Sequence, residues 1–167
     1  MEQSTRQNTK SALMRSAERL FAEKGLGTVS VKDITRAAGA RNPSAVHYLF
    51  GNVEELIKQV FAQRLRKIED DRTELLLNVD EADPDKRLLA LMEAALRPFL
   101  ATCLEEDGRL YVRFCVQFAS DPRFDVAQIV DEYSMRSLDI LQTKLAGCLA
   151  GIEQPILAAR LRHGFNI

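Results

Sequence analysis

Apolar residues recur at helical spacing from one end of the chain to the other, and this spacing limits the folds that the chain can adopt. The first such group is Leu13, Ala17, Leu20 and Phe21, at positions i, i+4, i+7 and i+8. Residues at this spacing share one face of a helix. Alternating segments rich in Val, Ile and Thr, which are typical of strands, are missing. The sequence therefore predicts an all-α protein.

Glycines and small polar residues mark the ends of the first two predicted helices. The first helix is expected over residues 9–24, and Gly25 and Gly27 end it. Ser30 is followed three residues later by Asp33, which is a capping-box arrangement. A short second helix is therefore expected to begin directly after Ser30.

A tight turn at Gly39 separates the second predicted helix from a third. Asn42 is expected to cap this third helix, with Pro43 at its first position, where a missing N–H costs nothing. The side expected to be buried comprises Ala45, Val46, Leu49 and Phe50, and the other side carries Ser44, His47 and Tyr48. Two short helices with a glycine turn between them, the second with a polar outer face, form the helix-turn-helix arrangement of DNA-binding proteins.

Longer helices are predicted in the rest of the chain. They are expected over residues 52–79, 85–104, 109–119 and 126–151, with a last helix beginning near residue 155. Residues 80–85 form a polar linker that contains a proline. We therefore expect a small N-terminal domain, residues 1–52, followed by a larger helical domain, residues 53–167.

Charge is divided unevenly between these two segments. Residues 1–52 hold eight Lys and Arg against four Asp and Glu, a net charge of +4, whereas residues 53–167 hold 15 against 20, a net charge of −5. A basic segment on an acidic body suits attraction to phosphates, because only the contacting surface must be positive. Chance unevenness is the alternative, and charge alone does not decide between the two.

Composition excludes several other classes of protein. With 46% hydrophobic and 28% charged residues, the chain is too apolar and too balanced in charge for a disordered protein. No apolar run approaches the roughly 20 residues that cross a bilayer, and the N-terminus is polar, so a cytoplasmic protein is expected. The three cysteines, Cys103, Cys115 and Cys148, are expected to be buried free thiols.

The sequence lacks the patterns that enzymes and metal sites require. It contains two histidines, and no nucleophile elbow, phosphate-binding loop or paired metal-ligand spacing. We therefore expect no enzyme, no metal and no cofactor.

Six residues are candidates for contact with double-stranded DNA. They are Ser30, Arg41, Asn42, Ser44, His47 and Tyr48. Early residues of the second helix in such a motif reach base edges, where Arg pairs with guanine and Asn with adenine. Tyr48 suits the sugar-phosphate wall, and Ser30 offers a hydroxyl at a helix N-terminus, where phosphates bind. The alternatives are that Asn42 is only a cap, His47 a surface histidine and Arg41 a solvated charge.

Residues 13–56 resemble the N-terminal domain of the tetracycline-repressor (TetR) family. The matching stretches are "AERLFAEKGLGTVSVKDITRAAGA" and "HYLFGNVEEL". The matching positions are Phe21, Gly25, Ser30, Val31, Ile34, Ala38, Gly39, Tyr48, Phe50, Glu55 and Leu56. The rest of the chain matches the family only in the number and length of its helices.

The resemblance implies a homodimeric, operator-binding transcription regulator, usually a repressor that a small-molecule effector releases from DNA. It places the base and phosphate contacts at the six residues given above, and effector binding and dimerisation in residues 53–167. The turn "GARNPSAVHY" is one residue longer than is common in the family, and Val53 stands where many members have a phosphate-contacting lysine. Family members continue with another long helix beyond this chain's last one, so the second domain is expected to be incomplete at its C-terminus.

An effector pocket is predicted between the helices of the second domain. Its expected lining is Met92, Arg97, Phe99, Arg113, Phe114, Gln117, Phe118 and Tyr133. The aromatic and Met side chains at these positions must first be interpreted as core packing, and the alternative for both arginines is that they reach the surface. Dimer contacts are expected at Ile156, Leu161 and Phe165 of the last helix.

A TetR-like helical module that binds proteins and not DNA is the alternative function, and Val53 is its best support.

Overall fold

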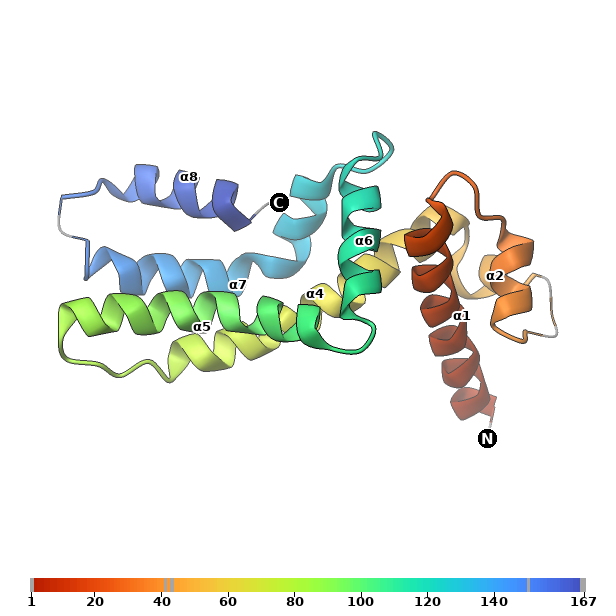
Figure 1. Cartoon of the computed structure of the whole chain (residues 1–167), viewed down its shortest axis with the longest axis horizontal. Helices are drawn as coiled ribbons and strands as arrows, with labels where there is room; N and C mark the ends of the chain where they lie inside the picture. The colour runs from red at the N-terminus through yellow and green to blue at the C-terminus, as the bar shows by residue number, and fades with distance from the viewer. Residues whose placement is uncertain (1, 41, 43, 150, 166–167) are drawn as a thin grey trace. The chain divides into compact units, whose positions relative to one another are not determined.

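The computed structural model describes residues 2–40, 42, 44–149 and 151–165, with only the backbone at 2–3, 127, 130–135 and 162–165. Eight helices make up this part of the chain, which contains no strand (Figure 1). They are α1 (Glu2–Lys24), α2 (Val31–Ala37), α3 (Ala45–Phe50), α4 (Val53–Leu77), α5 (Pro84–Leu104), α6 (Gly108–Ala119), α7 (Val126–Ala146) and α8 (Gln154–Phe165). The all-α prediction is confirmed. None of the described helices is long and apolar enough to cross a membrane.

The chain forms two compact units. Unit 1 comprises residues 1–63 and 106–124, and unit 2 comprises residues 64–105 and 125–167. α4 contributes residues to both units. The sequence placed α6 with the larger domain, whereas its contacts place it in unit 1. The boundary at residues 52 and 53 stays a prediction about where the DNA-binding function ends.

α6 belongs to unit 1 because it packs along α1 (Figure 1). Phe114 and Phe118 of α6 are fully buried. The ring centroid of Phe114 lies 6.3 Å from that of Phe21 on α1, and the Phe118 centroid lies 4.6 Å from that of Phe61 on α4. Phe124, which follows α6, lies 4.7 Å from Phe118. Each such ring buries a large apolar area, so this aromatic cluster holds α6 against the N-terminal helices.

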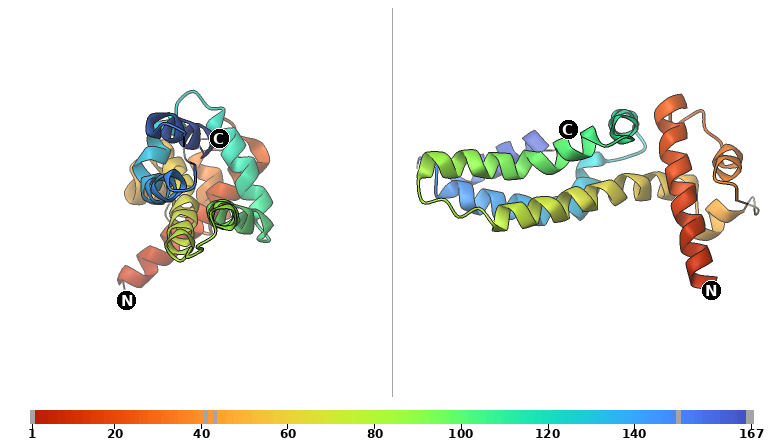
Figure 2. Two further views of the ribbon diagram at one scale, coloured as in Figure 1. Left: turned by 90° about the vertical axis from the view of Figure 1, so that its left-hand side faces the viewer. Right: turned by 60° about the horizontal axis from the view of Figure 1, so that its bottom comes forward.

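Unit 2 is a bundle in which α7 packs against both α5 and α8 (Figure 2). Its apolar core comprises Leu76, Leu91, Ala94, Ala95, Leu141, Leu145 and Leu157. These residues come from α4, α5, α7 and α8 and recur mostly three or four positions apart within a helix, as buried helix faces require.

A charged network lies inside unit 2 beside this core. The Glu69 carboxylate accepts the N–H of Ser137 at 2.7 Å and its O–H at 2.5 Å. The Arg72 guanidinium donates to the Ala95 carbonyl at 3.0 Å and to Ser137 Oγ at 3.3 Å, and lies 3.9 Å from Glu69. Burial lowers the pKa of Arg72, and the charge of Glu69 opposes that shift. The network ties α4 to α5 and α7, and each buried charge needs the other.

The start of α1 and the end of α7 differ most from the sequence-based helix boundaries. α1 begins at Glu2 and not at residue 9, because the polar residues at its start form helix without contributing to an apolar stripe. α7 ends at Ala146 and not at residue 151, because Gly147 follows as its C-cap.

Cys103, Cys115 and Cys148 form no disulfide, and each is partly and not fully buried, so the predicted full burial of these thiols is wrong. Burial raises the pKa of the Cys103 thiol. A raised thiol pKa leaves less of the reactive thiolate at neutral pH.

Replacing Phe118 with Ala should destabilise the protein by about 3–5 kcal/mol, because the change removes a fully buried ring from the aromatic cluster. Phe99 on α5 provides a matched control, since its side chain is 44% exposed. The same truncation there should cost less than about 1 kcal/mol. Urea unfolding followed by circular dichroism measures both changes, and equal losses would contradict the assignment of Phe118 to the core.

Candidate nucleic-acid interface

The start of α2 is fixed by the capping box that the sequence predicts. Ser30 Oγ accepts the N–H of Asp33 at 3.2 Å, and the Asp33 carboxylate accepts the N–H of Ser30 at 3.2 Å. The Ser30 hydroxyl also donates to the same carboxylate at 2.5 Å. The bond from the Ser30 hydroxyl contributes most to holding the pKa of Asp33 below its usual value, and the bond from the Ser30 N–H adds to this effect. Ser30 is exposed, but its hydroxyl proton is engaged, so a phosphate contact there would have to displace Asp33.

The end of α2 is closed by a turn that needs glycine. The N–H of Gly39 donates to the carbonyl of Arg36 at 3.1 Å, and the N–H of Ala40 donates to that of Thr35 at 2.9 Å. This pair of bonds is a Schellman motif, which requires a left-handed residue at the position of Gly39. Its φ is +63°, a conformation that residues with a Cβ rarely adopt. Gly39 therefore sets the direction in which the chain leaves α2 for α3.

The predicted cap of α3 is wrong by two residues. Ser44, and not Asn42, is the N-cap, and α3 begins at Ala45. Asn42 Oδ1 instead accepts the N–H of Ser44 at 2.9 Å. Asn commonly bonds the backbone two residues ahead of itself in a turn, and this bond competes with capping. Arg41 and Pro43, which were expected to contact a base and to open the helix, lie outside the described residues.

α3 has one buried edge and one exposed edge. Ala45, Val46 and Phe50 are buried in unit 1, as the sequence predicts, and Leu49 is half-buried. The candidate contact residues Asn42, Ser44, His47 and Tyr48 are all exposed. The Ser44 hydroxyl makes no capping bond, and Tyr48 is 69% exposed although it is a large aromatic residue. A helix with these two edges can lie against a partner without losing its attachment to the core.

The join between α3 and α4 consists of a glycine turn followed by an asparagine cap. The N–H of Gly51 donates to the carbonyl of His47 at 2.9 Å, and the φ of Gly51 is +85°. Asn52 Oδ1 accepts the N–H of Glu55 at 2.7 Å and so caps α4. No Asp or Glu occurs between Ile34 and Val53, so the chain itself supplies no carboxylate on this segment to repel phosphate.

Two cations near α3 were missed by the sequence interpretation. The Arg6 guanidinium carbon lies 5.2 Å from the ring centroid of Tyr48, and the Lys10 ammonium nitrogen lies 5.4 Å from that of Phe50. Both residues belong to the polar start of α1. Their spacing of four residues places them on one helix face. This spacing is the local sequence signal from which a shared role of the two cations could have been predicted.

The residues predicted to line an effector pocket are divided between the two units. Phe114 and Phe118 are core residues of unit 1, and Arg113 and Gln117 are exposed on α6. Met92, Arg97 and Phe99 lie on α5 of unit 2. Arg97 and Arg113 both reach the surface, which is the alternative that the sequence left open. The Tyr133 side chain lies outside the described residues.

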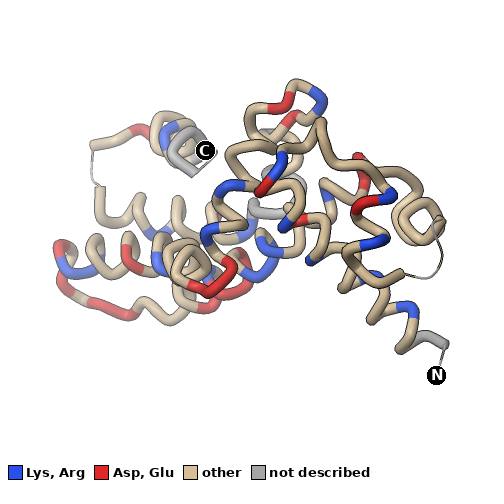
Figure 3. The backbone as a smooth tube through the Cα atoms, turned by 45° about the vertical axis from the view of Figure 1, so that its right-hand side comes forward, with Lys and Arg blue, Asp and Glu red and all other residues tan. Residues whose placement is uncertain are grey.

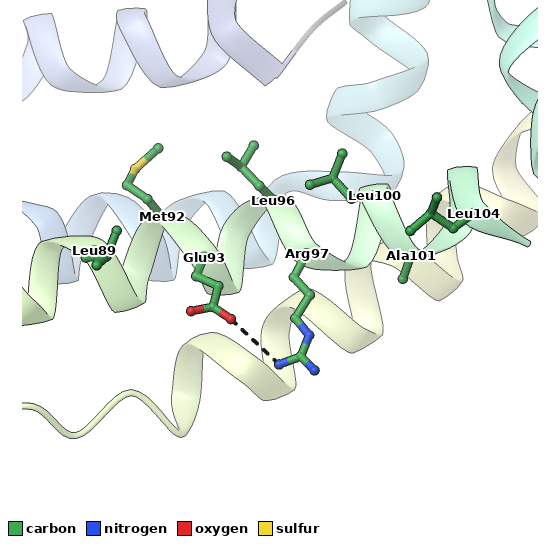
Figure 4. A pocket seen from close by; sticks show the side chains of 8 residues that line it. All are labelled: Leu89, Met92, Glu93, Leu96, Arg97, Leu100, Ala101 and Leu104. Carbon is green, nitrogen blue, oxygen red and sulfur yellow. Dashed lines mark ion pairs between the residues drawn. The ribbon is translucent and has the colours of Figure 1, made fainter.

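Unit 2 carries a shallow hollow of about 720 Å³ along one face of α5 (Figure 4). Its lining comprises Leu89, Met92, Glu93, Leu96, Arg97, Leu100, Ala101 and Leu104. Arg97 and Glu93 lie 3.9 Å apart and form an exposed ion pair among these apolar side chains. Two predicted pocket residues, Met92 and Arg97, therefore belong to one hollow. Among the described residues, no cluster of His, Cys, Asp and Glu could hold a metal.

The capped α2, the glycine turn and the two-edged α3 define a helix-turn-helix protein. Residues 13–60 match the family model described as bacterial regulatory proteins, tetR family. No protein of curated function matches the chain.

Solved structures share the fold over nearly the whole chain. The TetR family transcriptional regulator PfmR from Thermus thermophilus has a TM-score of 0.61 and 23% identity, covering 92% of this chain and 80% of that one. A protein from Streptomyces coelicolor A3(2) has a TM-score of 0.59 and 18% identity, covering 93% and 96%. A TetR family transcription regulator from Marinobacter aquaeolei has a TM-score of 0.55 and 18% identity, covering 97% and 96%. The N-terminal residues 13–60 thus match the tetR family model, and the chain as a whole shares the fold of these solved structures.

Replacing Gly39 with Ala should lower the free energy of unfolding by about 1–2 kcal/mol, because the new Cβ disfavours the left-handed conformation. Apart from its chain neighbours, no described residue has a heavy atom within 4 Å of that Cβ, so the cost is conformational and not a clash. Gly27 is the matched control, since it also has open space and lacks a positive φ. Alanine there should be neutral or stabilising by less than about 1 kcal/mol. Thermal unfolding compares the two, and equal effects would refute the role given to Gly39.

Proposed function

We propose that the protein is a sequence-specific DNA-binding transcription regulator that lays α3 in the major groove of an operator. The observation that carries the proposal is the exposure of Ser44, His47 and Tyr48 on one edge of α3, while Ala45, Val46 and Phe50 anchor the other. The match of residues 13–60 to the tetR family supports it independently.

Each exposed residue of this edge has chemistry that suits DNA. Asn42, Ser44 and His47 carry hydrogen-bonding groups at the start of the helix, which is the part that reaches base edges in this motif. Tyr48, at the next position, suits the sugar-phosphate wall with its hydroxyl and ring. The absence of carboxylates from residues 34–53 favours approach of a polyanion.

We propose further that the protein acts as a repressor and that an effector binds along the hollow of α5. The hollow offers leucine side chains and one guanidinium, which suits a small apolar molecule with an acidic group. Release would follow if the effector bound better to a dimer whose two α3 helices no longer fit half-sites about 34–36 Å apart. Helix α4 has residues in both compact units and is the covalent route for such a change.

The proposed homodimer would use the last helices of the chain. On α8, Ile156 is exposed and Leu161 is half-buried, which leaves apolar surface for a partner; the Phe165 side chain lies outside the described residues. A palindromic operator would match the two-fold symmetry of such a dimer.

A helical module that binds another protein is the second candidate. Val53 supports it, because the first turn of α4 then lacks the lysine that contacts phosphate in many family members. Salt-sensitive binding to DNA separates the two candidates, since phosphate contacts release counterions and a protein-binding module makes none.

Tyr48→Ala should weaken binding to a palindromic duplex from the protein's own upstream region at least tenfold, because the change removes the proposed contact with the sugar-phosphate wall. Arg113→Ala should leave the dissociation constant unchanged, since Arg113 is an exposed residue on α6. Electrophoretic mobility shifts at two salt concentrations measure both. Absence of salt-sensitive binding by the unaltered protein would favour the protein-binding module.

Leu96→Asp should weaken binding of the dye anilinonaphthalene sulfonate, which is apolar and anionic, because it places a negative charge in the α5 hollow. Leu77→Asp is the matched control, since Leu77 is 55% exposed but lies at the end of α4, outside that lining. Fluorescence titration gives both affinities. A loss of the same size in the two variants would remove the support for an effector site on α5.

A further inference from the structure

The start of α1 extends beyond the core of its own unit. Among the described side chains before Leu13, none is buried, and residues 4–8 are all exposed. Helical turns that bury no apolar face are marginal in water. The described contacts of these turns with α3 are made by Arg6 and Lys10. We therefore look for the role of these turns beside α3.

Arg6 and Lys10 share one face of α1 and both lie over aromatic rings of α3. Arg6 is 5.2 Å from the centroid of the Tyr48 ring, and Lys10 is 5.4 Å from that of Phe50. Tyr48 is one of the residues with which α3 is proposed to meet the DNA wall. The two cations are thus held at the flank of the proposed reading helix.

We propose that Arg6 and Lys10 bind phosphates of the DNA backbone beside the groove that α3 enters, so that α1 provides a second clamp on the duplex. The inference rests on the proposed DNA binding. The guanidinium of Arg6 lies over the Tyr48 ring, and its N–H donors can still donate to a phosphate. This contact also limits the rotamers of Arg6 and Tyr48, so less entropy is lost when both meet the backbone.

The charge around these residues favours a polyanion. Residues 3–17 contain Arg6, Lys10 and Arg15 and no Asp or Glu, and residues 34–53 contain no Asp or Glu either (Figure 3). The segments on both sides of the contact are therefore cationic without an internal carboxylate to neutralise them. The clamp also compensates for the lysine missing at Val53, because it supplies phosphate contacts from another helix.

The slope of the logarithm of affinity against the logarithm of salt concentration tests the proposal. Each phosphate contact contributes about 0.9 to the magnitude of this slope in duplex DNA. Arg6→Gln should reduce the magnitude of this slope by about 0.9. If the variant and the unaltered protein bind equally at 1 M salt, the variant should then bind roughly fivefold more weakly at physiological salt. Lys10→Gln should do the same independently, and Arg6→Lys should keep the wild-type slope because it keeps the charge.

Arg15→Gln is the matched control. It removes the same charge from the same helix. Arg15 follows Arg6 by nine residues, and at about 100° per residue it lies on the opposite side of α1. Fluorescence anisotropy with a labelled duplex from the protein's own upstream region gives the slope, and circular dichroism verifies that each variant is folded. An unchanged slope in Arg6→Gln and Lys10→Gln overturns the clamp. An equal reduction of the slope in Arg15→Gln also overturns it, because it would indicate a general effect of net charge and not a contact. If the unaltered protein shows no salt-dependent binding, the proposed function fails and not the clamp alone.

Discussion

The outward display of the polar edge of α3 depends on the packing of its other edge into the core of unit 1. Val46 and Phe50 are nearly inaccessible to solvent, and their burial fixes the rotation of the helix about its own axis. Because helical side chains have a fixed angular spacing, fixing the buried edge also fixes which residues face outward. His47 and Tyr48 are therefore displayed by the same contacts that stabilise the fold. A short helix of this kind could not hold its orientation by its own hydrogen bonds.

The rest of unit 1 supports that small helix. The capping box at Ser30 and the Schellman motif at Gly39 define both ends of α2, and the aromatic cluster of α6 braces α1 and the first part of α4. Unit 2 has its own apolar core and its own charged network at Glu69 and Arg72. The DNA-binding and effector-binding roles that we propose thus fall on elements that are stabilised by separate sets of contacts.

Local signals predicted the helices and the exposed edge well, because capping and amphipathicity act over three or four residues. The bond between Ser30 and Asp33 and the burial of Val46 are examples. The cap of α3 was misplaced because Asn42 and Ser44 can both cap, and only the turn geometry chooses between them. A sequence pattern does not show which partner an apolar helix face will find. Phe114 and Phe118 therefore looked like a pocket lining, although their partners are Phe21 and Phe61.

We propose that the exposed edge of α3 lies against duplex DNA while its buried edge stays in the core. Titration of ¹⁵N-labelled protein with a duplex from its upstream region, followed by amide chemical shifts, tests this most directly. We expect the largest shifts at residues 44–48, with small shifts at the buried Phe114 and Phe118 and along α5. Shifts concentrated on α5, with residues 44–48 unaffected at saturating duplex, would contradict it.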